Sequence, residues 1–362
     1  MNIFFDLPNL LICLLAVFIV FRLGIIPAWI ALILSLQAFT PYFLNNFLFP
    51  ANYMPDQFRY FDAVSQLRLL NFNHDDNYKI IITSWFLNFL PLPFLETITS
   101  LGFYNRFMFI VLFVWLYKKK FLSGITLYIV LFYPSLLLYT SLSLRDPLIL
   151  ILMIISTIFF LEKKYPQSFL MVIPLFLIKF QNFYLMLILF FILYLFRKDS
   201  FFYKIRYLLI VGFIVIIISY IDPILEQLNY YRFLLYIDND GDRQLFSNIQ
   251  DIYEFLIYGF KSALYFIVKP LPWEVNNFLQ VIQSVENIVL ILVIYIFTKR
   301  AYIQDRAITI KWLLFILFAL TIYGLTIFNF GTAARYKMPF ITLYVIGLSY
   351  ELYKIKGYRF GK

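Results

Sequence analysis

The stretch SFLMVIPLFLIKFQNFYLMLILFFILYLF (residues 168–196) decides the fold, because it is almost wholly apolar yet too long for one membrane crossing. As one helix it would measure about 44 Å, against about 30 Å for the hydrocarbon core of a bilayer. Basic residues flank both ends, in LEKKYP before it and FRKDSFFYK after it. Two short helices, 168–179 and 182–196, joined at KFQN (179–182), would bring both basic ends to one side of the membrane.

The rest of the chain has the same apolar character. Of its 362 residues, 63% are hydrophobic, 22% aromatic and 14% charged, which is more apolar surface than a soluble core needs. We therefore expect an all-α, polytopic integral membrane protein that forms a single domain over residues 1–362. About eleven spans are predicted: 4–21, 25–47, 101–117, 121–140, 147–161, 168–179, 182–196, 205–220, 277–298, 309–328 and 338–353.

The distribution of basic residues predicts the orientation of these spans. Most of the basic residues fall on one side of the predicted spans, in KKK (118–120), EKK (162–164), RKD (197–199), KR (299–300) and the C-terminal tail. The positive-inside rule then places the C-terminus in the cytoplasm and the N-terminus outside. Two larger segments, 48–100 and 221–276, lie outside, and each contains an amphipathic stretch expected along the outer membrane interface. The N-terminal stretch lacks a basic region and a cleavage site, so it is expected to be the first span.

Metal and disulfide chemistry find little support in the sequence. One cysteine, Cys13, excludes an internal disulfide and a zinc site built on paired thiolates, and the lone His74 excludes a histidine cluster. The acidic stretch IDNDGDRQ (237–244) departs from a calcium loop, because Ile249 stands where the loop needs its glutamate. We therefore predict neither a metal nor a cofactor.

The outer motif SLSLRDP (141–147) carries charges that need an explanation. Asp146 and Pro147 suit the first turn of the next helix, since a carboxylate favours the positive end of the helix dipole and proline is tolerated there. Arg145 has the wrong sign for that helix end. An anion bound from outside would resolve the conflict.

Three further outer motifs carry charge at the ends of spans. Lys179 would lie at the tip of the short helical hairpin, where the alternative is that its side chain extends to the membrane surface. Arg335 and Lys337 follow the small residues of NFGTAA (329–334), and Pro339 is expected to start the last helix. Cations at these positions would suit a phosphate. In the first outer segment, Asp56 and Tyr60 would share one face of a helix, although a solvated loop is the alternative.

These motifs, together with KPLPWE (269–274) and the many spans, resemble the Wzy-type oligosaccharide repeat-unit polymerases of bacterial surface polysaccharides (O-antigen or capsule) and related multispanning glycosyltransferases. The resemblance implies an inner-membrane glycosyltransferase. It would transfer a growing glycan from undecaprenyl diphosphate to the next lipid-linked repeat unit, on the outer face of the membrane.

The resemblance also implies roles for individual residues. Arg145 and Arg335 fall on basic motif positions and would stabilise the departing diphosphate, together with Lys179 and Lys337. Asp56 or Asp62 would remove the proton of the acceptor hydroxyl. The remaining predicted substrate-binding residues are Tyr60, Arg243 and Glu274.

Three alternatives stay open on the sequence. A related transferase would add single sugars from a polyprenyl-phosphate donor, and a flippase would move lipid-linked oligosaccharide without chemistry. A purely structural membrane protein would tolerate alanine at Arg145 and Arg335. The polymerase interpretation predicts as partners the undecaprenyl-diphosphate-linked oligosaccharide, membrane lipid, and a chain-length regulator and flippase of the same pathway, and no nucleic acid.

Overall fold

The protein is helical throughout the residues that the computed structural model describes, namely 3–45, 47–71, 77–88, 94–197, 201–237 and 246–357. These residues form helices α1 to α17 and one short 3-10 helix, Ala51–Tyr53. The β-structure found among them is one isolated bridge between Asn45 and Phe49. The predicted all-α class is confirmed.

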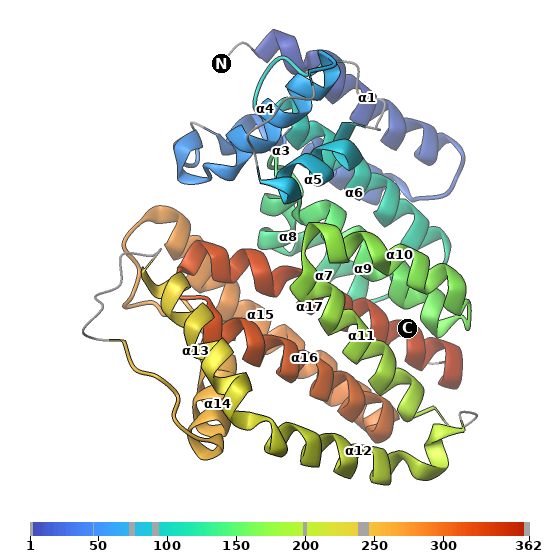
Figure 1. Cartoon of the computed structure of the whole chain (residues 1–362). Coiled ribbons are helices and arrows are strands. Elements are labelled where there is room, and N and C mark those ends of the chain that lie inside the picture. Colours follow the sequence, from blue (N-terminus) through green and yellow to red (C-terminus); the bar gives the residue numbers. More distant parts are fainter. Residues whose placement is uncertain are drawn as a thin grey trace. The chain divides into compact units, whose positions relative to one another are not determined.

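The chain divides into two compact units, which Figure 1 shows in sequence colours. Unit 1 comprises Met1–Tyr184 and Val345–Lys362, and unit 2 comprises Leu185–Tyr344. Unit 1 contains α1 (Ile3–Arg22), α2 (Ala28–Ala38), α3 (Thr40–Leu44), α4 (Asp56–Arg68), α5 (Tyr78–Asn88), α6 (Ser100–Lys118), α7 (Ile125–Phe132), α8 (Pro134–Tyr139), α9 (Asp146–Leu161) and α10 (Tyr165–Ile178). Unit 2 contains α12 (Phe202–Ser219), α13 (Ile221–Ile237), α14 (Ile252–Val268), α15 (Phe278–Gln304) and α16 (Arg306–Thr326). The boundaries fall inside α11 (Phe180–Leu195) and α17 (Phe330–Lys356).

Unit 1 is built around α6, α9 and α10. Helices α9 and α10 pack against each other along their length, and α6 packs on both α1 and α9 (Figure 1). The turn between α9 and α10 is short, with Lys163 at a φ of 68°. Because α9 and α10 are antiparallel, the end of α10 returns to the start of α9. That return places the start of α9 and the end of α10 side by side.

Unit 2 is organised by capped helices and one close helix contact. The caps of α14, α15 and α16 are Asp251, Asn277 and Asp305, whose side chains accept from backbone N–H groups at 2.8, 3.0 and 2.9 Å. Such caps satisfy N–H groups that a helix leaves open at its start. Helices α14 and α16 lie so close that a Cβ on Gly324 would be 2.5 Å from the carbonyl oxygen of Ser262.

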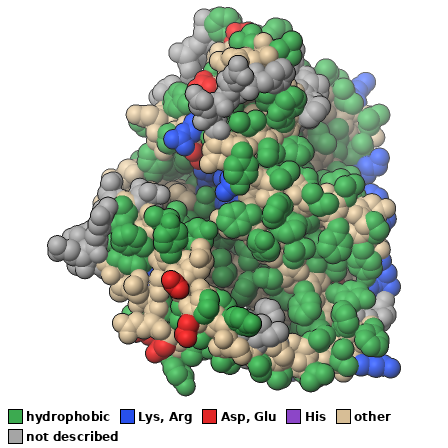
Figure 2. Space-filling view, viewed as in Figure 1, with side chains coloured by type: hydrophobic (Ala, Val, Ile, Leu, Met, Phe, Trp, Pro, Cys, Tyr) green, Lys and Arg blue, Asp and Glu red, His purple; other side chains and the backbone are tan. Residues whose placement is uncertain are grey.

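Several helices have the length and composition of membrane spans. Among the described residues, four helices are long and apolar enough to cross a membrane: Phe4–Arg22, Ser100–Lys118, Phe278–Gln304 and Arg306–Thr326. Shorter apolar helices are Ala28–Ala38, Asp146–Leu161, Tyr165–Ile178 and Phe180–Leu195. Figure 2 shows hydrophobic side chains over much of the face in view. The count of eleven spans stays a prediction.

The predicted break in the long apolar stretch is confirmed, and it is sharper than expected. Helix α10 ends at Ile178 and α11 begins at Phe180, so a single residue separates them. That residue is Lys179, whose φ of −155° and ψ of 85° are not helical.

Three other predicted helix boundaries are wrong, each at a proline. The span expected over 25–47 breaks at Phe39, because Pro41 has no N–H to donate to the carbonyl of Gln37. That carbonyl accepts a hydrogen bond from the Thr40 hydroxyl instead. The span expected over 121–140 breaks at Tyr133, whose extended backbone precedes Pro134. Pro339 does not start the last helix but lies inside α17, which begins at Phe330.

Candidate functional site

The segment 140–145, which leads into α9, is fixed on α6 by close contact and hydrogen bonds. Gly102 allows this approach, since a Cβ there would lie 2.5 Å from the carbonyl oxygen of Ser141. The Asn105 amide donates to the carbonyls of Leu142 and Leu144, at 2.6 and 2.8 Å. Arg145, the last residue of this segment, is therefore held by a rigid support.

Arg145 bridges the start of one helix and the end of another. It is half-buried next to the first residue of α9, as expected, and its Nη1 donates to the carbonyl oxygen of Ile178 at 3.0 Å. Ile178 is the last residue of α10, where a cation is favourable because the carbonyl end of a helix is negative. The Nε of Arg145 is buried and has no hydrogen-bond partner among the described residues. The guanidinium is thus only partly used by the fold.

Lys179 follows directly on the carbonyl that Arg145 binds. Its side chain is buried, with 6% of its surface exposed. A second cation, Lys79 at the start of α5, lies with its Nζ 5.0 Å from the centroid of the Phe180 ring. The helix break therefore gathers three basic residues in one region of unit 1.

Helix α4 joins the same region through Gln57. The Gln57 and Asn45 amides exchange two hydrogen bonds of 3.0 and 3.1 Å, and Gln57 Oε1 also accepts from the backbone N–H of Ser143 at 3.4 Å. Asp56, in the first turn of α4, is thereby placed near the segment that carries Arg145, with buried Tyr60 one turn further on. Asp62 is exposed on α4 and about 120° around it from Asp56.

In unit 2, Lys337 lies fully buried within a ring of neutral oxygens. Its Nζ donates to the carbonyls of Ile267 and Lys269 at 3.0 and 3.2 Å and to Asn287 Oδ1 at 2.5 Å. The Asn287 amide nitrogen in turn donates to the carbonyls of Val268 and Lys269 at 3.0 and 2.9 Å. These contacts fix the ammonium without using a carboxylate as acceptor.

Lys269, which was not among the predicted site residues, is the second buried cation of this cluster. It lies between α14 and α15, with 2% of its surface exposed, and its Nζ donates to the carbonyl of Ile327 at 2.5 Å. Burial lowers the pKa of Lys269 to about 8, although the nearby Glu274 opposes the shift. The KPLPWE motif was the signal that could have identified this residue.

Two predicted residues of unit 2 have different surroundings. Arg335 lies in α17 with 8% of its surface exposed and its guanidinium 5.9 Å from the centroid of the Tyr336 ring. Glu274 closes its own turn, accepting from the Leu271 N–H at 2.8 Å and from the Tyr265 hydroxyl at 2.7 Å. The predicted residue Arg243, the disfavoured calcium loop around it and His74 lie outside the described residues.

A buried polar face of α15 was missed by the sequence reasoning. Gln283, Glu286 and Asn287 are all buried, and their spacing of three and four residues places them on one side of the helix. Asn287 reaches Lys337, so this side is turned toward the lysine cluster. Both amide atoms of Gln283 are buried without a hydrogen-bond partner among the described residues. Polar residues at helical spacing in QSVEN (283–287) were the available signal.

Arg106 in α6 was missed as well. It is fully buried, donates to Thr140 Oγ1 at 3.1 Å and to Gln37 Oε1, and lies 4.9 Å from the centroid of the Phe109 ring. A cation inside an apolar helix is costly in a membrane, so it marks a structural or functional requirement. Here its partners tie α2 and the segment 140–145 to α6.

Both units thus hold buried cations that are bonded mainly to carbonyl and amide oxygens. Within the described parts of the chain, no group of three His, Cys, Asp or Glu side chains is placed to hold a metal ion. Comparison of the chain with protein-family models, with curated proteins and with solved structures finds no significant match.

Proposed function

We propose that the protein is a membrane glycosyltransferase that polymerises lipid-diphosphate-linked oligosaccharide repeat units into a surface polysaccharide. The observation that carries the proposal is the burial of Lys269 and Lys337 side by side, with their ammonium groups bonded to neutral oxygens. The carboxylates of Glu286 and Glu274 lie nearby, but both ammonium groups are bonded to neutral oxygens, so the proposed anionic ligand would supply a direct counter-charge. Resemblance of the outer motifs to Wzy-type polymerases supports a lipid diphosphate as that anion.

The chemistry needs a group that stabilises a departing diphosphate and a group that accepts a proton. The acceptor hydroxyl oxygen attacks the anomeric carbon, the bond from that carbon to the diphosphate oxygen breaks, and the electron pair leaves on the diphosphate. Within unit 1, Arg145 and Lys179 are the proposed cations for the departing diphosphate. Within unit 2, Lys337 and Arg335 are proposed as an anion-binding cluster of their own. Arg145 is suited to this role because its Nε is not used by the fold.

Asp56 is the better candidate for the proton acceptor. It lies at the start of α4, in the region of Arg145, whereas Asp62 is exposed on another side of that helix. Tyr60 lies one turn after Asp56 on α4 and is proposed to help bind the substrate. Glu274 is proposed to contribute indirectly, because it closes the turn next to Lys269.

The proposed setting is the bacterial inner membrane, with about eleven spans, the N-terminus outside and the C-terminus in the cytoplasm. The basic ends of α6 and α9 support this orientation. Lys119 and Lys164 line one cavity, and Lys354 of α17 donates to the carbonyl of Leu161 at 2.8 Å. Three of the predicted cytoplasmic clusters therefore lie together in unit 1, at the far end of α9 from Arg145.

The proposal is tested in a strain that lacks the gene and carries plasmid copies of variants. We expect Arg145→Ala and Lys337→Met to give surface glycans with a single repeat unit, seen as loss of the ladder on a gel. Arg59→Ala is the matched control, because Arg59 is an exposed arginine of the same unit.

Three outcomes would contradict the proposal. Normal ladders from both site variants, at normal protein levels, would exclude the assigned residues. Loss of one sugar within each repeat unit would indicate a polyprenyl-phosphate-dependent transferase. Accumulation of lipid-linked repeat units on the cytoplasmic face would indicate a flippase.

A further inference from the structure

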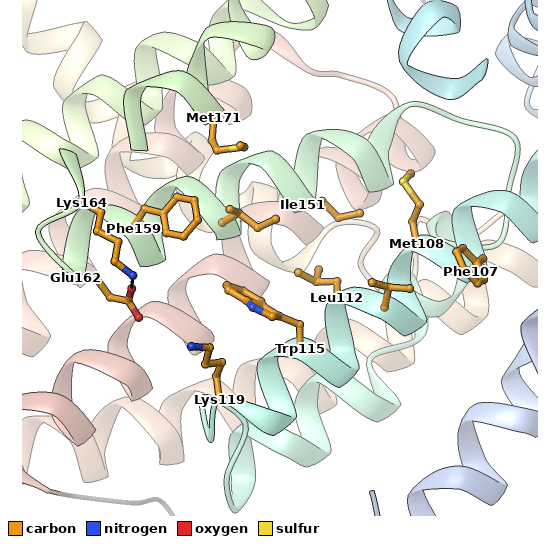
Figure 3. A pocket seen from close by; sticks show the side chains of 12 residues that line it. Phe107, Met108, Leu112, Trp115, Lys119, Ile151, Phe159, Glu162, Lys164 and Met171 are labelled. Atoms are coloured by element: carbon orange, nitrogen blue, oxygen red, sulfur yellow. Dashed lines mark hydrogen bonds and ion pairs between the residues drawn. The ribbon is translucent and has the colours of Figure 1, made fainter. Parts of the chain in front are cut away.

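Unit 1 contains an apolar groove that the proposed reaction does not use. It lies between α6, α9 and α10 and has a volume of about 550 Å³. Its walls include Leu112 and Trp115 of α6, Ile151, Ile155 and Phe159 of α9, and Met171 of α10 (Figure 3).

The groove is apolar along its length and charged at one end. Lys119, Glu162 and Lys164 lie together at that end, and Phe107 and Met108 lie at the other (Figure 3). Glu162 and Lys164 form an ion pair of 2.6 Å, so Lys119 adds a net positive charge. The charged end is therefore complementary to an anion.

The dimensions of the groove match one leaflet of a membrane. From Phe107 to Lys119, α6 rises by about 18 Å. Half of the hydrocarbon core of a bilayer measures about 15 Å. A chain that fills the groove would therefore start at the basic end of the helices and reach the middle of the bilayer.

We propose that this groove binds one acyl chain of an anionic phospholipid whose phosphate contacts Lys119 and Lys164. Phosphatidylglycerol represents the class, because its headgroup is anionic, whereas that of phosphatidylcholine carries no net charge. The site lies at the end of α9 opposite to Arg145, so it is separate from the proposed diphosphate site of unit 1. The proposal rests on the membrane location in the proposed function and not on the polymerase activity.

The groove contains its own spectroscopic probe in Trp115. The full-length protein is reconstituted in phosphatidylcholine vesicles that contain an increasing fraction of phosphatidylglycerol with brominated acyl chains, which quench nearby tryptophans. Subtraction of the same titration with Trp115→Phe isolates the signal of Trp115. We expect saturable quenching by brominated phosphatidylglycerol, and only a linear rise with brominated phosphatidylcholine.

Charge variants test the headgroup contact. Each basic residue near an anionic surface contributes roughly fivefold in affinity, and the Glu162 pairing of Lys164 reduces its share. We therefore expect the Lys119→Gln, Lys164→Gln double variant to raise the half-saturating lipid fraction roughly tenfold. The Lys118→Gln, Lys163→Gln double variant removes the same charge from residues that do not line the groove, and it should change that fraction less than twofold.

A third variant tests the acyl chain. Ile155→Phe narrows the groove without a change of charge, and it should reduce the saturable quenching. Equal quenching by the two brominated lipids, or equal effects of the two charge variants, would overturn the proposal. Glycan ladders from the same variants report separately on the proposed polymerase.

Discussion

Replacement of Gly102 by alanine tests how the segment before α9 is supported. An added Cβ would lie 2.5 Å from the carbonyl oxygen of Ser141 and 3.3 Å from its carbonyl carbon. Ordinary contact begins near 3.4 Å, so the segment must retreat by about 0.9 Å, the difference between 3.4 and 2.5 Å. Both close atoms belong to the backbone, so no side chain can rotate away.

The expected cost follows from overpacking. Forced displacement of a packed segment costs about 1 to 3 kcal/mol, while alanine gains up to about 1 kcal/mol over glycine in a helix. Gly212→Ala is the matched control, because Gly212 is also helical and a Cβ there would meet nothing within 4 Å. The helix gain is common to both variants. The difference between them therefore isolates the contact with Ser141.

The free energy of unfolding of the two variants is compared by denaturant titration in the same mixed micelles. We expect Gly102→Ala to be less stable than Gly212→Ala by about 1 to 3 kcal/mol. Under the proposed function, the displaced segment also moves Arg145 and shortens the glycan ladder. Equal stability of the two variants would refute the close approach of α6 to residue 141.

Three further predictions concern the lysine cluster of unit 2. The pKa of Lys269 is lowered to about 8 in the folded protein, so between about pH 8 and the ordinary pKa of about 10.5 the unfolded chain binds more protons than the folded chain. The free energy of unfolding of the ligand-free protein should therefore rise across that pH window. Unfolding measured at each pH should show a flatter rise for Lys269→Met. Anion binding that needs the charged ammonium should weaken above pH 8 over the same window, and Lys269→Arg should keep it, as a pH series of polymerisation rates would show. Asn287→Leu removes two donated hydrogen bonds and an acceptor of Lys337, and it should lower the free energy of unfolding by about 2 to 4 kcal/mol; a change below about 0.5 kcal/mol, typical of surface substitutions, would contradict the hydrogen-bonded role of the amide.

The parts of the fold that the sequence predicted are those fixed by length and local charge. The break at Lys179 follows from an apolar stretch too long for one span with basic residues at both ends. The start of α9 follows from Asp146 and Pro147, which suit a first turn. Hydrophobicity alone cannot locate the breaks at Phe39 and Tyr133, because the prolines beside them lie in apolar runs and proline is tolerated in membrane helices.

The candidate site was predictable only where charges stand at the ends of spans. Arg145, Lys179 and Lys337 were proposed as site residues in this way. Glu286 and Arg106 were missed, because a charge within an apolar run gives no sign of its partner in the linear sequence. Arg106, for example, bonds Gln37 and Thr140, which are 69 and 34 residues away. Such pairings depend on how helices pack, which the periodicity of one helix does not reveal.

Arg145 shows why a structural and a functional role are compatible in one side chain. Its positive charge is unfavourable next to the positive N-terminal end of α9, but its hydrogen bond to the Ile178 carbonyl is favourable at the negative C-terminal end of α10. A lysine would satisfy that carbonyl equally well, since the contact needs one donor. An arginine offers five N–H donors in a rigid fork, and its Nε remains buried without a partner among the described residues. This arginine therefore has a donor left for an additional acceptor, and under the proposed function that acceptor is a phosphate, which matches the geometry of the fork.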